Sequence, residues 1–308
     1  MKVRASRARL GRGGIGTKLI VLLLVAGLVP MAVIGVLSVN KASGSLRKDS
    51  GQAVEELAFN AIDKLDRNLF ERYGDVQAFS LSYPAQTMLP ERVATWIDTM
   101  MGTYSPIYKL MIVADKRGQI IAVNRIDLDG KPLPKARGLV GRDVSGEAWF
   151  QRAMSGEVKD GTSLVEDVHH DALMAAVYGT VDGADLAMSF TAPIKGADGE
   201  IIGVWTNRFN WEVATTILAE NAARAHASGM TTVELGLAAP GGAILASPNA
   251  TDVLAGSYVG RSGVADPQAA SVGSAAGTTL SGAAGLEGWA RSAGYSIYPG
   301  VGWTLVAS

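Results

Sequence analysis

The densest cluster of chemically active side chains is the stretch EDVHHD at residues 166–171. Carboxylates and imidazoles this close together could bind Zn²⁺ or Ni²⁺. Adjacent side chains on a strand point to opposite faces, however, so His169 and His170 cannot both reach one metal without a turn between them. The stretch ends an apolar strand that begins at Leu164. We therefore expect a polar loop, which either contacts a ligand at the mouth of a pocket or is simply solvated.

Few other side chains in the sequence are suited to catalysis. The chain has three His and no Cys, and it lacks both a Gly-rich phosphate loop with a Lys and a Gly-x-Ser-x-Gly elbow. A metal-dependent hydrolase would need ligands beyond the His pair, and His226 is the only other His. The sequence thus predicts no catalytic residue, no bound metal and no cofactor, and it indicates a binding protein rather than an enzyme.

Charge is distributed unevenly along the 308 residues. The net charge is −1, but residues 1–39 contain six Lys or Arg and no acid. Taking these six from the 28 basic residues leaves 22 against 29 acidic ones, so the rest of the chain carries −7. Nucleic-acid binding would need a basic patch on the folded part. The composition therefore argues against a nucleic-acid partner.

The run Leu19–Val39 contains 21 residues without a charge. At about 1.5 Å per residue a helix of this length spans the hydrocarbon core of a bilayer, and Pro30 is tolerated there. The basic tail before it should stay in the cytoplasm, which places the residues after Asn40 outside. A cleaved signal peptide is the alternative, but its apolar region is usually shorter. The sequence predicts an uncleaved anchor in the cytoplasmic membrane.

After this run, a long amphipathic helix is predicted within residues 40–104. Charged residues separate apolar ones that recur mostly at spacings of three, four, seven or eight: Leu46, Val54, Leu57, Ala61, Leu65, Leu69, Val76 and Phe79. Such a stripe either packs on its own domain or forms a coiled-coil contact with a second chain. Both uses remain open, so a homodimer is one expectation.

The rest of the chain contains a weak internal repeat. The strand–turn–strand pattern of residues 113–122 recurs 124 residues later at 237–246. Each copy ends in a predicted hairpin, one through Asp198-Gly199 and one from residues 295–297 through Pro299-Gly300 to residues 302–305. Between the copies, residues 211–228 predict a helix closed by Gly229. The segment 256–288 is rich in Gly, Ala and Ser, so we expect loose loops there.

This arrangement resembles the N-terminal sensing half of a bacterial chemoreceptor, a methyl-accepting chemotaxis protein with a double-Cache ligand-binding domain. The similarity rests on FERYGDVQAF at 70–79, on Trp149-Phe150 before a helix, on the hairpin PI…DG…IIGVW and on the ending GWTLVAS. Family members continue from such an ending into a second transmembrane helix and a signalling coiled coil. The resemblance therefore indicates a receptor truncated at Ser308.

The resemblance implies an α+β fold, with two PAS-like antiparallel-sheet Cache modules after the transmembrane and amphipathic helices. It divides the chain into a basic tail (1–18), a transmembrane helix (19–39), a long extracytoplasmic helix (40–104), a membrane-distal module (105–210), a connecting helix (211–229) and a membrane-proximal module (230–308).

The resemblance also places the ligand in the distal module. In amino-acid-binding members, an Arg two residues before a Trp-Tyr pair holds the ligand carboxylate, and an Asp near the end of the last strand holds its ammonium. Here these positions carry Glu147 and Arg208, so both charges are inverted and that binding mode is not expected. The candidate site residues are Arg208, Trp149, Glu147, Trp205, Tyr178, His169 and His170. An equally weighted alternative is a structural ion pair between Glu147 and Arg208.

The predicted function is extracytoplasmic sensing of a small molecule by a transmembrane chemoreceptor. Two other outputs are compatible with such a sensor, a histidine kinase and a diguanylate cyclase. A third alternative is a membrane-anchored or secreted small-molecule binding protein. The expected partners are a small ligand, the membrane and, in a full-length receptor, a second copy of the chain.

Overall fold

The computed structural model describes residues 14–265 and 269–308. The chain divides by its contacts into two units, Met1–Ser50 and Gly51–Ser308. Most of the basic tail predicted over residues 1–18 lies outside the described residues.

Helix α1 (Ile15–Ser80) contains the apolar run that was predicted to cross a membrane. Among the described residues it is the one helix that is long and apolar enough for this, by length and composition. Pro30 lies inside the helix. The side chains of residues 19–39 are all exposed in the first unit. A continuous apolar surface of this length is expected where lipid, and not water, covers the helix.

The later turns of α1, from Gly51 onward, build the core of the second unit. The stripe residues Ala61, Leu65, Leu69, Val76 and Phe79 are buried, and Val54 and Leu57 pack against the same cluster. From Val54 onward, the stripe therefore packs on its own unit, which was one of its two predicted uses. Dimerisation through this helix stays a prediction.

The helical segment predicted over residues 40–104 is not one helix. The chain leaves α1 at Ser80, and two further helices follow, α2 (Tyr83–Gln86) and α3 (Pro90–Thr103). The Ser82 side chain caps α2 by accepting a hydrogen bond from the Ala85 amide. Proline begins α3 and lies in the first turn of α2. Because proline lacks an amide hydrogen, it suits a helix start and interrupts a continuous helix.

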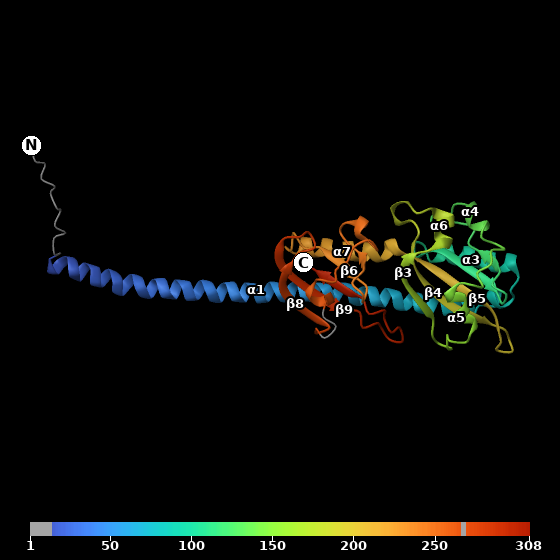
Figure 1. The fold of residues 1–308 in the computed structure, drawn as a ribbon, viewed down its shortest axis with the longest axis horizontal. Coiled ribbons are helices and arrows are strands. Elements are labelled where there is room, and N and C mark those ends of the chain that lie inside the picture. Colours follow the sequence, from blue (N-terminus) through green and yellow to red (C-terminus); the bar gives the residue numbers. More distant parts are fainter. Residues whose placement is uncertain (1–13, 266–268) are drawn as a thin grey trace, which may run out of the picture. The chain divides into compact units, whose positions relative to one another are not determined.

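The first sheet has five antiparallel strands in the order β2-β1-β5-β4-β3. Figure 1 labels three of them, β3, β4 and β5. Its strands are β1 (Tyr108–Asp115), β2 (Ile120–Val123), β3 (Leu164–His170), β4 (Leu186–Lys195) and β5 (Ile201–Asn210). The predicted hairpin through Asp198-Gly199 is confirmed as β4–β5. Gly199 has a φ of 84°, a backbone conformation that glycine adopts without steric cost.

The second sheet repeats this connectivity, with the order β7-β6-β10-β9-β8. Its strands are β6 (Leu235–Ala238), β7 (Ile244–Ala246), β8 (Val272–Thr278), β9 (Ala284–Arg291) and β10 (Thr304–Ala307). In both sheets the last strand in the sequence lies at the centre, between the first and the fourth. The internal repeat predicted from residues 113–122 and 237–246 is therefore confirmed.

The final hairpin was placed wrongly. Strand β10 pairs antiparallel with β6 on one side and with β9 on the other, where Thr304 is opposite Arg291 and Ala307 opposite Gly288. Residues 292–303 form a long connection, which includes an isolated bridge between Tyr295 and Tyr298. The Pro-Gly pair at 299–300 therefore turns the chain within a loop and does not join two paired strands.

Part of the Gly-rich segment 256–288, which was predicted to form loose loops, is instead in strands, namely β8 and the start of β9. Residues 266–268 of this segment lie outside the described residues. Small residues are needed there because other groups approach closely. A Cβ on Gly288 would lie 2.5 Å from the backbone carbonyl carbon of Val54 in α1, and one on Gly273 would lie 2.5 Å from the Trp289 ring. At Gly273 and Gly288 the lack of a side chain therefore allows the strands to pack closely on a tryptophan and on α1.

Helix α7 (Trp211–Ala227) joins the two sheets, close to the predicted range of 211–228. The Asn210 side chain caps it by accepting a hydrogen bond from the Glu212 amide. Trp211 donates a hydrogen bond to the Leu245 carbonyl in β7 and contacts Trp303 with ring centroids 5.5 Å apart. Trp303 in turn donates to Asp167 in β3. These contacts hold the two sheets together within the second unit.

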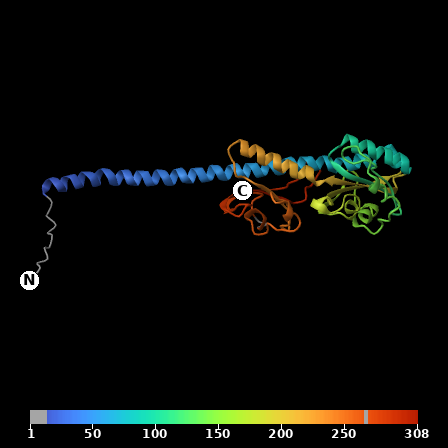
Figure 2. The same ribbon diagram turned by 90° about the horizontal axis from the view of Figure 1, so that it is seen from above.

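The two faces of the first sheet pack against different helices. Trp205 and Phe209 of β5 belong to the core that includes α1 and α3. Val204 belongs to a second core on the other face, formed with three short helices: α4 (Pro134–Arg137), α5 (Ala148–Met154) and α6 (Ala172–Tyr178). Figure 2 shows the green segment with these helices on the opposite side of the sheet from α1. We call the α5–α6 side the covered face.

Candidate functional site

Buried polar side chains interrupt the apolar core on the covered face. Alternation along β5 brings Thr206 and Arg208 to this face, and alternation along β4 brings Ser189 and Thr191 there. The two strands pair in a register that puts Ser189 opposite Arg208 and Thr191 opposite Thr206. All four side chains are buried. The surrounding cluster is otherwise apolar, so these residues form a distinct polar site inside it.

Arg208 lies at the centre of this polar site and is only 1% exposed. Its Nε donates to Asp171 Oδ2 over 2.6 Å, and its Nη1 donates to the Thr206 hydroxyl over 2.6 Å. The guanidinium carbon lies 5.4 Å from the centroid of the Trp149 ring. The predicted neighbourhood of Arg208 and Trp149 is thus present, with an ion pair and a cation–π contact.

Asp171 is the ionic partner of Arg208, and it also caps α6. Its Oδ1 accepts hydrogen bonds from the Leu173 and Met174 amides. Burial acts to raise the pKa of the Asp171 carboxyl, but the Arg208 charge and the hydrogen bonds from His169 and the Met174 amide outweigh it. The net pKa lies well below its ordinary value, so Asp171 is a carboxylate at neutral pH.

The polar loop predicted at residues 166–171 is not observed, since residues 166–170 belong to strand β3. His169 and His170 point to opposite faces of that strand, as the alternation predicted. His169 is opposite Ala187 of the covered face, and its Nε2 lies 3.5 Å from Asp171 Oδ2. The hydrogen bond with Asp171 raises the pKa of His169, against an opposing effect of burial. His170 instead is exposed and pairs with Asp185 at 2.9 Å. Only His169 therefore belongs to the polar site.

Glu147 does not pair with Arg208. It is exposed at the residue that precedes α5, while Trp149 two positions later is buried on the covered face. The structural ion pair proposed between Glu147 and Arg208 is thus absent, and Asp171 takes that place. Because the Glu147 carboxylate stays in solvent, its charge is screened from Arg208.

Trp205 was expected to form a wall of the same pocket, but it lies on the other face of the sheet. It is adjacent to Thr206 in β5, so its side chain points toward α1. There it contacts Phe79 with ring centroids 5.7 Å apart, and its Nε1 donates to Asn207 over 2.7 Å. Trp205 is therefore a core residue of the α1 side. The site prediction failed here because it ignored the period-two alternation of the strand.

Tyr178 lies at the end of α6, against the apolar cluster of the covered face. Its hydroxyl donates to the Lys109 carbonyl over 2.7 Å, and burial raises the pKa of its phenol above the ordinary value. It therefore links α6 to β1.

Sequence reasoning missed Asp171, Ser189, Thr191 and Thr206 as site residues. An Asp before the apolar run ALM is an N-cap signal, and polar residues two apart on otherwise apolar strands indicate one shared face. The Thr191 and Thr206 hydroxyls are 2.7 Å apart. The buried Ser189 hydroxyl has no hydrogen-bond partner among the described residues. A buried hydroxyl without a partner is costly and marks a place where a ligand could bind.

In the described ranges 14–265 and 269–308, no group of three or more His, Asp or Glu side chains could hold a metal ion. The polar site offers an Arg, a carboxylate, hydroxyls and an imidazole beside an indole. This set can orient a small polar molecule, and the residues contain no activated nucleophile. The fold and the site together define a two-sheet domain with a buried polar site on the covered face of its first sheet.

Solved structures with a similar fold include ligand-binding domains of receptors. One is the ligand-binding domain of the amino acid chemoreceptor PctC of Pseudomonas aeruginosa PAO1 in complex with GABA. It has a TM-score of 0.56 and 18% identity, over 84% of this chain and 99% of that one. Another is that of the Pseudomonas fluorescens chemoreceptor CtaA in complex with L-serine, with a TM-score of 0.55 and 17% identity over 85% and 97%.

A third similar structure is an extracellular ligand binding receptor from Desulfohalobium retbaense DSM5692. It has a TM-score of 0.54 and 14% identity, and the match covers 83% of this chain but only 40% of that one. No protein-family model matches the chain, and no curated protein matches it in sequence. At these identities the likeness is one of fold: the chain has the double-Cache architecture of chemoreceptor ligand-binding domains.

Proposed function

We propose that this chain is the sensing part of a membrane-anchored chemoreceptor and that it binds a small ligand at the polar site of the first sheet. The observation that carries the proposal is the Arg208–Asp171 pair, buried in an otherwise apolar core on the covered face. The fold it shares with chemoreceptor ligand-binding domains supports the same function.

Stability alone is a weak reason for such a pair. Removing two charges from water costs several kcal/mol per ion, and well-packed apolar residues often replace a buried ion pair without loss of stability. The pair here also stands beside the unpartnered Ser189 hydroxyl and against the Trp149 ring. A polar site of this kind is better explained by recognition of a ligand that completes its hydrogen bonds.

The ligand class follows from the donors and acceptors of the site. Arg208 offers a planar fork that matches a carboxylate, and Trp149 offers a flat apolar wall beside it. Asp171 and the hydroxyls supply acceptors for an ammonium or hydroxyl group of the same molecule. The ligand is therefore a small organic acid, including amino acids that enter with their charges matched to Arg208 and Asp171. Ligand entry displaces part of the Arg208–Asp171 contact and moves α5 or α6, because the site is closed from solvent.

In the complete receptor, α1 links this unit to the apolar segment in the cytoplasmic membrane. The basic tail is cytoplasmic, the unit Gly51–Ser308 is periplasmic or extracellular, and two copies of the receptor associate. Ligand binding then biases a two-state equilibrium of the helices by its differential affinity for the two states. The proposed ranges of the amino-terminal tail, the anchor, the two modules and the connecting helix are unchanged. The range proposed for the long helix, 40–104, is divided at Ser80, where α1 ends.

The test is a thermal-shift screen of the full chain in detergent against organic acids, amines, purines and amino acids. A ligand that binds only the folded state adds about 2.7 kcal/mol at a hundredfold excess over Kd, which raises the melting temperature. We expect carboxylates to give the shift. The site variant is Arg208→Met combined with Asp171→Asn, which removes both charges while Asn retains the cap of α6.

This double variant should fold and lose the shift, whereas the exposed control Glu147→Gln should keep it. If the double variant responds like the wild type, the polar site does not bind the ligand. If no carboxylate shifts the wild-type chain, the proposed ligand class is wrong.

A further inference from the structure

Asp66 is a buried carboxylate that lies outside the polar site. It belongs to α1, within the unit Gly51–Ser308, and is only 3% exposed. Its Oδ1 accepts a hydrogen bond from the Ser292 hydroxyl over 2.7 Å, and its Oδ2 accepts one from the Gly294 amide over 3.0 Å. Both donors belong to the connection 292–303 that leads into β10. Asp66 therefore holds this connection against α1.

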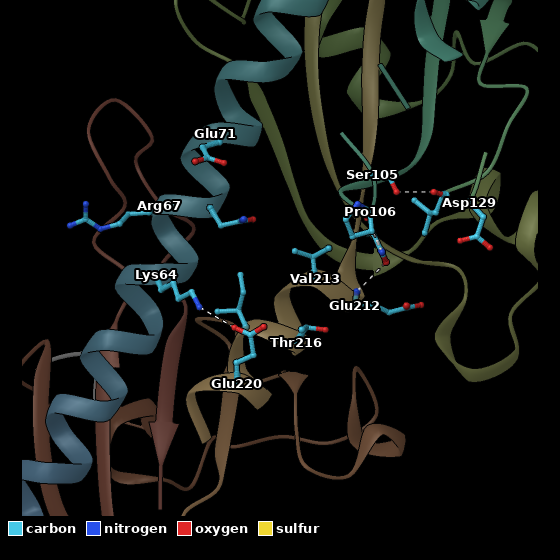
Figure 3. A pocket seen from close by; sticks show the side chains of 14 residues that line it. Lys64, Arg67, Glu71, Ser105, Pro106, Asp129, Glu212, Val213, Thr216 and Glu220 are labelled. Carbon is cyan, nitrogen blue, oxygen red and sulfur yellow. Dashed lines mark hydrogen bonds and ion pairs between the residues drawn. The ribbon is translucent and has the colours of Figure 1, made fainter. Parts of the chain in front are cut away.

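No cation balances the charge of this carboxylate. Among the described residues, no Lys, Arg or His side chain forms an ion pair with Asp66. Lys64 instead pairs with Glu220 of α7 at 3.2 Å, and Arg67 pairs with Asp63 at 2.7 Å. Figure 3 shows Lys64 pointing toward α7 and Arg67 pointing to the opposite side of α1. Asp66 is thus buried with neutral hydrogen-bond donors only.

The remaining titratable groups around Asp66 are acids and phenols. Asp63, one turn earlier on α1, adds a negative charge that raises the pKa of Asp66. The connection 292–303 contributes Tyr295 and Tyr298, and Tyr298 is 1% exposed with no hydrogen-bond partner for its hydroxyl among the described residues. Burial, and then the charges of Asp66 and of Asp167 in β3, raise the pKa of the Tyr298 phenol. A proton on Asp66 would therefore relieve an unfavourable concentration of negative charge.

Burial has the largest effect on the Asp66 carboxyl. It raises the pKa above the ordinary value of 3.8, and the hydrogen bonds from Ser292 and Gly294 oppose this only in part. A carboxylate that is buried without a cation loses its hydration, and the neutral form avoids most of that cost. When the connection leaves α1, water reaches the carboxyl again. The attached state therefore binds a proton more tightly than the detached state, so acid favours attachment.

We propose that Asp66 is a proton-binding site and that the chain senses acidity through it. Protonated Asp66 holds the connection 292–303 firmly on α1, and the buried charge of ionised Asp66 weakens this contact. The same helix contains the apolar anchor segment. Neither Arg208 nor Asp171 takes part, so this input is separate from ligand binding at the polar site.

The experiment is a series of thermal melts of the full chain in a non-ionic detergent between pH 4 and pH 8, with Asp66→Asn as the variant. Asparagine has the shape of the protonated side chain and stays neutral at every pH. A raised folded-state pKa gives stabilisation that is fully present below pH 3.8 and is lost as the pH rises through the folded pKa. The melting temperature of the wild type should therefore fall relative to that of Asp66→Asn as the pH rises.

Other titrations, including that of His169, are common to the two chains and cancel in this difference. The matched control is Asp49→Asn, which changes an exposed carboxylate on the same helix and should show no such pH-dependent difference. Hydrogen exchange measured by mass spectrometry locates the effect, with labelling times scaled for the intrinsic pH dependence of exchange. Peptides from 292–303 should exchange faster at pH 8 than at pH 4 in the wild type, and about equally in Asp66→Asn.

Ser292→Ala is a second variant, which also decides the question if Asp66→Asn does not fold. It removes a hydrogen bond that lowers the pKa of Asp66, so the transition should move to higher pH. The Arg208→Met/Asp171→Asn variant should retain the transition. The proposal is overturned if the wild type and Asp66→Asn depend on pH alike, if Ser292→Ala leaves the transition in place or moves it to lower pH, or if the polar-site variant abolishes it.

Discussion

At the scale of single residues, the polar site depends on Asp171. This carboxylate contacts Arg208, His169 and two amides of α6, so one side chain links β5, β3 and the helix that covers them. The hydrogen bonds that Asp171 accepts stabilise its ionised form. The ionised carboxylate in turn neutralises the buried charge of the Arg208 guanidinium. Loss of either partner alone should therefore cost more stability than loss of both together.

His169 makes stability depend on pH. Its pKa is raised in the folded chain from the model peptide value of 6.5, first by the hydrogen bond with Asp171 and against burial. A raised folded-state pKa gives stabilisation that is fully present below pH 6.5 and is lost as the pH rises through the folded pKa. We expect the advantage of the wild type over His169→Gln in unfolding free energy to shrink as the pH rises from 6 to 8.

The effect should be less than about 1 kcal/mol, because the His169 side chain is 39% exposed and solvent screens its charge. Denaturant titrations at several pH values measure it. In the Arg208→Met/Asp171→Asn background the same substitution should show no such pH dependence, since the carboxylate is gone. An advantage that grows with pH would contradict the assignment of Asp171 as the partner.

At the scale of elements, α1 combines two kinds of apolar surface. The part of α1 that belongs to the first unit exposes apolar residues on all sides. The turns of α1 after Gly51 bury a single stripe. A helix that is apolar all round suits lipid, and a helix with one stripe suits packing on a sheet. The change from one pattern to the other falls where the contacts divide the chain into two units.

Leu65→Glu tests the use of the stripe. Leu65 is 0% exposed, so a glutamate there would bury an unpaired charge and should lower the unfolding free energy by about 3 kcal/mol or more. Leu46→Glu is the control, since Leu46 belongs to the same predicted stripe but is 66% exposed. Circular dichroism melts should show a large loss for the first change and almost none for the second. Equal losses would mean that Leu46 is also buried, by a contact with another chain.

At the scale of the whole molecule, the proposed topology can be tested directly. Six basic residues and no acid precede the apolar run, which favours a cytoplasmic N-terminus. A reporter enzyme that is active only outside the cytoplasm should therefore be active when it is fused after Ser308. The matched control places the same reporter before Met1, where it should be silent. A silent C-terminal fusion at normal expression would reverse the orientation.

Much of this architecture follows from local patterns. The apolar run, the amphipathic stripe, the two related strand–turn–strand motifs and the capped helix at 211–228 each depend on neighbouring residues in the sequence. They predicted a membrane-type helix followed by two similar antiparallel sheets, and the structure contains them. The sequence order also predicted that His169 and His170 would separate, because alternation along a strand is a local property.

Tertiary structure alone decided which side chains share the polar site. The sequence left open whether Arg208 forms an ion pair with Glu147. The register of β4 on β5 and the position of α6 show that its partner is Asp171. The composition around Gly288 favours a loop, and only the packing of its strand on α1 shows why a glycine is needed there. The partner of β10 likewise depends on sheet pairing between residues that are not adjacent in the chain. Pairing and close approach depend on distances in space, and a sequence determines these only through the complete set of packing contacts.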